Sequence, residues 1–464
     1  MGEVLILGAG FSHAVNECMP LTDDLGNRIL DVTDLRGDPR APANGFGPDV
    51  PFETWLSLLA EDQPYLATSN NIESRQIFER VLRSLTFLVS TEEMKAIGND
   101  APPWFYDLLS VLHFTRATAI SFNYDTLVEV GVTSHRLLAP DGEAVTARDV
   151  LWDVPPIPRA AESTWADLNR ALRDSFRLLK LHGSLDWWWV PGDVSGATLN
   201  RGKVGSTFGN VSILSEKDQF RQFGGRERFI VAPLATKSSY YRNPTSRALW
   251  LQAAEALMSA DRIALVGYSL PVADMVVNGM LGLALRTGSR PIDIVNPNPG
   301  DLPRRLVHLG ADPAQLEVVD SVESFTDQMC DRASGDLTSK LGQLVIGDGS
   351  DTKLLVTWGH PKAIGTHAVK SIRKSDDDKT VELLLDDDSA QGATATHYNQ
   401  MGTPVDRQLP ALDDLTRAAR DAERLVARLP DNRRVPVVGC WSEHQETGES
   451  LKWLALAPAG RPPK

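Results

Sequence analysis

The sequence has few cysteines, and their spacing suits neither a zinc ribbon nor a disulfide framework. Cys18, Cys330 and Cys440 stand far apart, and no Cys-x-x-Cys pair occurs among the 464 residues. Cysteine-rich zinc sites need closely spaced thiolate ligands, and disulfide-stabilised folds need more cysteines than this. We therefore expect no disulfide framework and no bound metal.

Long apolar runs and positive net charge are also absent. No stretch approaches the length of a membrane span, and the first residues do not combine a basic region with a cleavable apolar segment. The net charge of −14 repels nucleic acid unless basic residues gather on one face. We expect a cytoplasmic protein that contacts neither a membrane nor nucleic acid directly.

The opening of the chain is its most informative segment. An apolar run, Val4–Leu7, reaches the turn Gly8-Ala9-Gly10 and then Phe11 and Ser12. Glycines at such a turn allow a tight bend, and they let a dinucleotide phosphate approach the N-terminus of the following helix. Alone this signal is weak, because glycine-rich turns after strands are common.

Two later apolar runs also end in residues capable of chemistry. The first, at 117–122, is followed by Asn123 and Asp125, and the second, at 176–182, ends at His182. In an open α/β sheet, ligands bind at the carboxyl ends of the strands. Further strands are expected at 229–232, 263–267, 292–295 and 316–319, with a helix at 246–260.

This alternation of strands and helices predicts a Rossmann-like, doubly wound parallel sheet over residues 1–335. A helical pattern at about 52–112 predicts an insertion between the first two strands. Residues 341–464 differ in composition and predict a small, β-rich α+β domain. Within it we expect strands at 354–357 and 380–385, a helix after Pro410 that carries apolar residues on one face as far as Leu429, and a hairpin of 435–441 with 451–456.

Taken together, the motifs resemble those of sirtuin-like domains. They are Gly8-Ala-Gly-Phe-Ser12, Phe122-Asn-Tyr-Asp125, Leu181-His-Gly-Ser184, Gly267-Tyr-Ser269-Leu-Pro271 with Asp274, and Val295-Asn296-Pro297. The stretch Ile230–Pro233 with Lys237 is similar to the bacterial branch of that family. This branch includes defence-associated NAD hydrolases, so the resemblance implies NAD as substrate, antiphage defence as the setting, and oligomer formation.

The chemistry of NAD cleavage suits two of these residues directly. Breaking the nicotinamide–ribose bond produces an oxocarbenium-like ribose, and the Asn123 amide can hold a ribose hydroxyl or the attacking water. Neutral His182 can accept a proton from either near pH 7. Asn123 can instead cap the next helix, which is a common function of asparagine. His13 is expected to be an incidental helix residue.

The resemblance implies the remaining ligand contacts. Asp125 would bind the nicotinamide carboxamide. The turn formed by Gly8, Ala9, Gly10, Phe11 and Ser12 would cradle the pyrophosphate. Gly267 and Ser269 would meet phosphate or the adenosine ribose, and Asn296 would meet that ribose.

Two departures from the protein-deacylating sirtuins favour hydrolysis over peptide deacylation. Those enzymes carry a four-cysteine zinc ribbon, and they usually have Gln where this chain has Phe122. We predict an NAD hydrolase that releases nicotinamide and ADP-ribose, with 341–464 as a regulatory module for an activating partner protein. The alternatives are an NAD-dependent deacylase or ADP-ribosyl transferase, a non-catalytic NAD or ADP-ribose sensor, and a helicase-linked effector.

Overall fold

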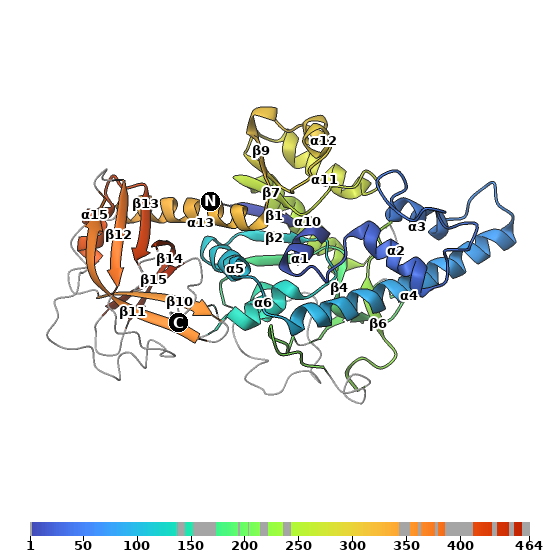
Figure 1. Cartoon of the computed structure of the whole chain (residues 1–464), viewed down its shortest axis with the longest axis horizontal. Helices are drawn as coiled ribbons and strands as arrows, with labels where there is room; N and C mark the ends of the chain where they lie inside the picture. Colours follow the sequence, from blue (N-terminus) through green and yellow to red (C-terminus); the bar gives the residue numbers. More distant parts are fainter. Residues whose placement is uncertain are drawn as a thin grey trace.

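The computed structural model describes residues 2–135, 137, 144–151, 173–193, 195–202, 204–213, 221–234, 243–342, 353–360, 363–375, 379–385, 412–428, 434–444 and 450–456. Within these ranges the chain forms a large α/β domain and a smaller barrel domain, which lies at one end of the molecule (Figure 1). No helix in these ranges combines the length and the apolar character that crossing a membrane requires.

A six-stranded parallel sheet is the centre of the α/β domain. Its strand order is β3-β2-β1-β7-β8-β9, which is the doubly wound order that reverses between β1 and β7. The strands are β1 (Glu3–Leu7), β2 (Thr118–Ser121), β3 (Arg177–Lys180), β7 (Arg262–Val266), β8 (Ile292–Val295) and β9 (Leu316–Val319). The predicted Rossmann-like fold is therefore confirmed.

Alternating residues of these strands enter two separate apolar cores, as the two-residue period of a strand requires. Leu5 and Leu7 belong to one core, and Val4 and Ile6 to the other. Helices with a residue in the first core include α1 (Ala9–Val15), α5 (Pro103–Thr115), α6 (Leu127–His135), α7 (Ala147–Val150) and α13 (Val322–Gly342). Those with a residue in the second are α10 (Pro244–Ser259), α11 (Met275–Arg286) and α12 (Leu302–Leu309). The sheet is thus buried on both faces.

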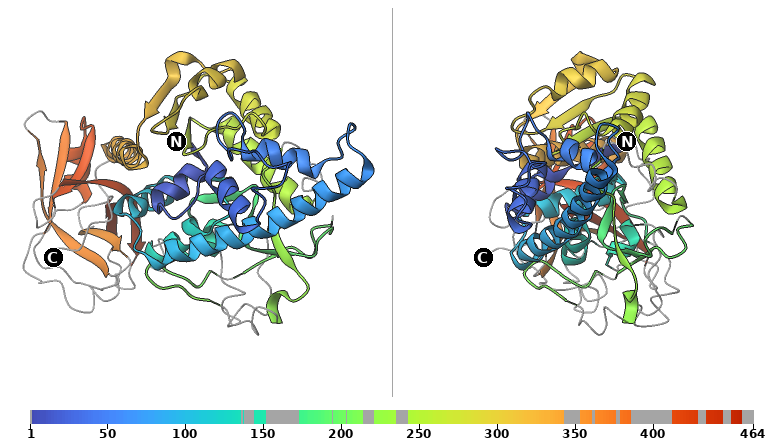
Figure 2. Two further views of the ribbon diagram at one scale, coloured as in Figure 1. Left: turned by 45° about the vertical axis from the view of Figure 1, so that its right-hand side comes forward. Right: turned by 90° about the vertical axis from the view of Figure 1, so that its right-hand side faces the viewer.

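The predicted helical insertion is present between β1 and β2. It follows α2 (Thr22–Val32) and begins with α3 (Phe52–Ala60). Its largest element is the 31-residue helix α4 (Thr68–Gly98). The long α4 runs along the α/β domain and extends away from the barrel (Figure 2). Its buried positions, such as Ile77, Val81 and Leu85, recur every four residues, which places them on one face against the core.

The strand predicted at 229–232 does not belong to the parallel sheet. It forms β6 (Glu227–Ile230), which pairs antiparallel with β4 (Gly183–Trp189) in a separate three-stranded sheet that also contains β5 (Asn200–Arg201). The turn between β3 and β4 occupies only Leu181 and His182, too few residues for a parallel crossover, so β4 leaves the main sheet. The prediction of a strand was right, and its placement in the main sheet was wrong.

The smaller domain is a closed barrel of six strands. They are β10 (Lys353–His360), β11 (Ala363–Lys374), β12 (Thr380–Leu385), β13 (Arg424–Arg428), β14 (Arg434–His444) and β15 (Ser450–Leu456). The pairing of β14 with β15 confirms the predicted last hairpin. The helix predicted to reach Leu429 was too long: α15 (Leu412–Ala419) ends early, and Val426 lies in β13. Asp421 takes a left-handed backbone conformation there, with φ of 66°, which breaks the helical path.

Candidate functional site

A cavity of about 720 Å³ opens at the carboxyl ends of the strands, where the sheet order reverses between β1 and β7. We call it the switch-point cavity. Its lining includes the residue after β1 (Gly8), the loop after β2 (Phe122–Asp125), the loop after β7 (Gly267–Ser269) and the loop after β8 (Asn296–Asn298). A volume of this size is typical of sites for cofactor-sized ligands.

Three glycines hold the start of α1 against the end of β7. A Cβ on Gly8 would lie 2.6 Å from Gly267 O, and one on Gly10 would lie 2.9 Å from the same oxygen. Gly267 itself has φ of +59°, and its Cβ would lie 2.1 Å from the Phe11 nitrogen. The Gly10 N–H donates to Gly267 O at 2.9 Å, so this N–H is used inside the protein rather than facing a ligand.

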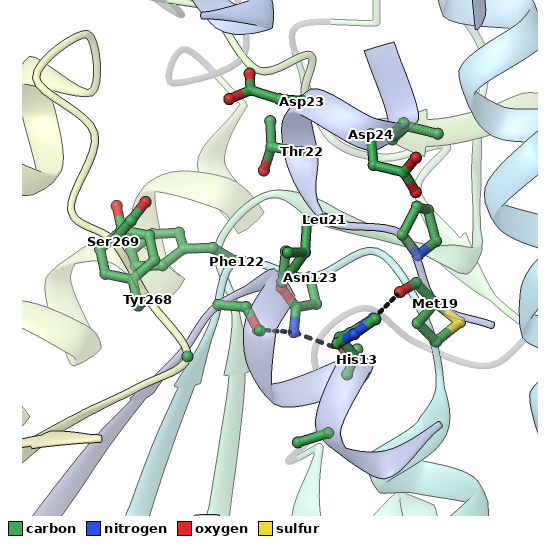
Figure 3. A pocket seen from close by; sticks show the side chains of 18 of the residues that line it. His13, Met19, Leu21, Thr22, Asp23, Asp24, Phe122, Asn123, Tyr268 and Ser269 are labelled. Atoms are coloured by element: carbon green, nitrogen blue, oxygen red, sulfur yellow. Dashed lines mark hydrogen bonds between the residues drawn. The ribbon is translucent and has the colours of Figure 1, made fainter. Parts of the chain in front are cut away.

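The Asn123 side chain is fixed by two hydrogen bonds (Figure 3). Its Nδ2 donates to Gly8 O at 2.8 Å and to Ser12 Oγ at 2.8 Å. Because a peptide oxygen only accepts hydrogen bonds, the atom facing Gly8 O must be the amide nitrogen. Both amide hydrogens are then used, and the Asn123 Oδ1 has no hydrogen-bond partner within the described ranges. What Asn123 offers a ligand in the cavity is therefore an acceptor.

Ser12 continues this chain of hydrogen bonds to Asp125. The Ser12 Oγ accepts from Asn123 and donates its proton to Asp125 Oδ2 at 2.7 Å. The other oxygen, Asp125 Oδ1, accepts from the Leu127 N–H at 3.2 Å. Because the Ser12 hydroxyl donates to the Asp125 carboxylate, it accepts more strongly from the Asn123 amide. This polarises the amide and makes Asn123 Oδ1 a stronger acceptor. Ser12 and Asp125 thus orient Asn123 as well as lining the cavity.

His182 lies beside an aromatic wall. Its ring packs on Phe122 with centroids 4.8 Å apart, and Phe122 in turn stacks on Tyr268 at 4.8 Å. The His182 Nε2 lies 3.7 Å from Asp274 Oδ2, and the backbone oxygen of His182 accepts from the Val231 N–H. The side chains of His182 and Asp274 are each 7% exposed. The imidazole therefore borders the cavity while apolar rings shield it from bulk water.

The structure brings together nearly all the residues predicted from sequence. Those that line the switch-point cavity are Gly8, Ala9, Gly10, Ser12, Asn123, Asp125, His182, Gly267, Ser269 and Asn296. Phe11 is outside this lining, because its ring packs in the core against Trp104 and Phe105 at centroid distances of 6.3 and 6.0 Å. The ligand contacts assigned to the lining residues stay predictions. Lys237 lies outside the described ranges.

Sequence reasoning missed several residues of the cavity wall. His13, expected to be incidental, lines the cavity, and its Nδ1 lies 2.8 Å from Met19 O (Figure 3). Because that oxygen only accepts, Nδ1 carries the proton in this arrangement. Asp274 also lines the cavity, although the motif gave it no assigned function. It lies eight residues after the end of β7 and directly precedes α11.

The described lining is acidic. It includes the carboxyl groups of Asp23, Asp24, Glu53, Asp125, Asp274 and Asp320, and no lysine or arginine among the described residues. Acidic surroundings stabilise positive charge on a bound group. No group of three or more His, Cys, Asp or Glu side chains suited to hold a metal ion occurs in the ranges described. The arrangement suits a ligand that carries or develops positive charge.

Comparison with known proteins found similar solved structures but no sequence match. No family model matches the sequence, and no curated protein matches it. Among solved structures, the chain is similar to one described as "Structural Basis for the Mechanism and Regulation of Sir2 Enzymes". That match has 14% sequence identity and a TM-score of 0.31, and it covers 71% of this chain and 90% of the other. The order and direction of the six strands are what define the fold class.

Proposed function

We propose that this chain is an NAD hydrolase that cleaves the nicotinamide–ribose bond and releases nicotinamide and ADP-ribose. The observation that carries the proposal is the fixed amide of Asn123. Both of its hydrogens bind within the protein, so its oxygen is the part directed to a ligand. A hydrogen-bond acceptor at this place suits a ribose hydroxyl or an attacking water.

The reaction needs three contributions that these residues can supply. The C1′–N bond breaks with its electron pair leaving on nicotinamide, and the ribose gains positive charge. The acidic lining stabilises that charge. Asn123 Oδ1 then accepts a hydrogen bond from the water that attacks C1′, and His182 accepts the proton that this water releases. The products are nicotinamide, ADP-ribose and a proton.

Phe122 supports hydrolysis rather than transfer to a peptide. Its ring lies between those of His182 and Tyr268, so this part of the wall is apolar. An apolar wall offers no hydrogen bonds to an extended polar backbone, such as that of an acceptor peptide. As a biological setting we propose NAD depletion in bacterial antiphage defence, which rests on the motif resemblance alone. Oligomer formation and an activating partner bound through 341–464 stay predictions.

The test is nicotinamide release from NAD by the purified chain and by two variants, Asn123→Ala and His182→Ala. We expect each substitution to lower kcat by about 100-fold or more, as expected for loss of a positioning or proton-accepting group. Glu79→Gln, at an exposed position on α4 outside the cavity lining, serves as a control that leaves the site untouched.

Three outcomes would contradict the proposal. Wild-type activity in both variants would exclude this site. Product formation that depends on an added peptide or other acceptor would show a deacylase or transferase instead. Tight NAD binding without nicotinamide release, both alone and with extract from infected cells, would indicate a sensor.

A further inference from the structure

A buried lysine lies directly beneath the two proposed functional segments. Lys180 is the last residue of β3, two positions before His182, and its side chain is 1% exposed. A lysine is almost never buried to this degree unless its charge is paired. Its burial directly beneath the proposed site therefore requires partners for its charge.

All three hydrogens of the Lys180 ammonium have partners. The Nζ donates to Glu129 Oε1 at 2.8 Å, to Ser184 Oγ at 2.6 Å and to the backbone oxygen of Asp125 at 2.5 Å. An ammonium has three donors, so this set is complete. Glu129 belongs to α6 and is also 1% exposed, which makes the pair a fully buried ion pair.

These bonds join the loop that carries Asn123 to the turn that carries His182. Asp125 follows β2, and Ser184 follows His182 in the next strand. Ser184 Oγ donates in turn to Tyr124 O at 3.3 Å, and the Leu185 N–H donates to the same oxygen at 2.8 Å. Lys180 is thus the point where the two segments meet.

The surrounding charges keep this lysine protonated. Burial alone would lower the pKa of Lys180, but the carboxylates of Glu129, Asp186 and Asp125 outweigh it and raise that pKa. Burial raises the pKa of the Glu129 carboxyl, against the opposing charge of Lys180. Replacing such a pair by neutral groups is often tolerated, whereas removing one partner leaves a buried charge unpaired.

We propose that Lys180 is a positioning residue, which fixes the loop of Asn123 relative to the turn of His182 through its bonds to Asp125, Glu129 and Ser184. The effect of Lys180 on turnover rests on the proposed NAD cleavage, whereas its role in holding the two segments together does not. Because Lys180 lies behind both segments and is absent from the cavity lining described above, its loss should change geometry rather than ligand contacts.

The test separates stability from positioning by comparing Lys180→Met with Lys180→Met/Glu129→Gln. The single variant leaves Glu129 buried without its partner, so we expect a lower melting temperature. The double variant removes both charges, so we expect most of the melting temperature to return. In both variants we expect kcat for NAD cleavage to fall about 100-fold, as for a small displacement of reacting groups. KM for NAD should stay within about threefold of the wild-type value.

A control uses another ion pair, whose carboxylate is buried. Arg262 Nη1 binds Asp293 Oδ1 at 2.6 Å, and Asp293 is fully buried. These residues lie near the amino ends of β7 and β8, at the opposite edge of the sheet from the cavity. Arg262→Met/Asp293→Asn should change the melting temperature while leaving kcat at the wild-type value.

Amide hydrogen exchange provides a readout that does not depend on turnover. In the double variant, peptides covering 122–127 and 182–186 should exchange about tenfold faster, while those covering β7 and β8 stay unchanged. If the double variant regains stability and keeps both wild-type kcat and wild-type protection, Lys180 is only a structural residue and the inference is wrong. If the wild-type chain cleaves no NAD, the proposed function fails, and the exchange result alone decides the inference.

Discussion

At the scale of single residues, buried polar contacts hold the loop after β2 in place. Asn123 binds the glycine turn, Asp125 accepts from Ser12, and its backbone oxygen accepts from Lys180. Next to them, Glu93 of α4 accepts from the Thr126 N–H at 2.5 Å and from Thr126 Oγ1 at 2.8 Å. Groups from the sheet, α1 and the helical insertion therefore fix one short segment, as a site with defined geometry requires.

Glu93 makes the stability of the protein depend on pH. Burial raises the pKa of Glu93 from an ordinary value of 4.5 to about 7, although the bonds from Thr126 oppose this shift. The folded state therefore favours the protonated carboxyl, and the contribution of Glu93 to stability is lost as pH rises from 4.5 to about 7. In Glu93→Gln the amide oxygen still accepts from Thr126, and no charge forms. We expect the variant to be more stable than wild type by about 2–3 kcal/mol at pH 8 and nearly equal at pH 4.5.

Urea unfolding at the two pH values measures this difference. Glu79→Gln, at an exposed position on the same helix, is the matched control and should change the free energy of unfolding equally little at both. Equal pH dependence in wild type and Glu93→Gln would contradict the prediction.

The sequence was sufficient to locate polar residues at strand ends but not the groups behind them. Asn123 and His182 directly follow apolar strands, and parallel strands place their carboxyl ends at one edge, so their meeting could be predicted. Lys180 ends a short strand, and only the three-dimensional arrangement reveals that Glu129, 51 positions earlier, is its partner. Glu93 is hidden in the same way within a long helix whose charged residues are mostly exposed.

At the scale of elements, the glycine turn at the start of α1 contacts the loop after β7, and both segments line the cavity. The close approach of these two backbones requires glycine at 267, where φ is positive and any side chain would meet the Phe11 nitrogen. The neighbouring Leu270 also has positive φ, and Arg305 of α12 donates to the backbone oxygens of Ser269 and Leu270. The loop is therefore held in a strained conformation by surrounding structure.

Gly267→Ala should disturb this contact strongly. The new Cβ would lie 2.1 Å from the Phe11 nitrogen and 2.4 Å from the Gly10 carbonyl carbon, both backbone atoms that cannot rotate away. We expect a loss of about 3 kcal/mol in the free energy of unfolding, from the left-handed conformation together with overpacking. Gly279→Ala on α11 is the control, because its Cβ would meet no atom within 4 Å. That change should stabilise the protein by about 0.5–1 kcal/mol. Equal losses in the two variants, measured by urea unfolding, would show that the close approach is unimportant.

Element types were easier to predict than element partners. The strand at 229–232 and the helix after Pro410 were both expected, yet β6 pairs outside the main sheet and α15 ends at Ala419. Local pattern determines whether a segment is helical or extended, but pairing depends on distant residues such as those of β4. Closure of the barrel was likewise not expected, because β10 pairs with β15 almost a hundred residues away.

At the scale of the whole molecule, α13 connects the cavity to the barrel. Its first residue, Val322, lines the switch-point cavity, and Phe325 and Met329 pack in the α/β core. Further along, Leu337 packs against the barrel core. The barrel also contacts α5, where a Cβ on Gly439 would lie 2.2 Å from the Phe114 ring. If a partner binds residues 341–464, the single helix α13 would thus connect them to the cavity.

A buried polar link between the two domains is Ser334, in the middle of α13. Its Oγ donates to Leu425 O at 2.7 Å and accepts from the Leu425 N–H at 3.1 Å. The pairing of β13 with β14 covers only Val426–Arg428, so Ser334 supplies the partner that β14 does not. Ser334→Ala leaves both backbone groups buried without this partner. We expect the free energy of unfolding to fall by about 2–4 kcal/mol, from one unsatisfied donor and one unsatisfied acceptor.

The control for Ser334→Ala is Thr326→Val on the same helix, which removes a buried hydroxyl bonded to Val322 O within α13. It should cost about 1 kcal/mol or less, because the helix keeps its own backbone bonds. Calorimetry and limited proteolysis together measure the result. Because the two bonds join β13 to α13, Ser334→Ala should also expose the barrel to protease first, whereas Thr326→Val should not. Equal stability and equal cleavage in both variants would show that the bonds of Ser334 do not hold the barrel in place.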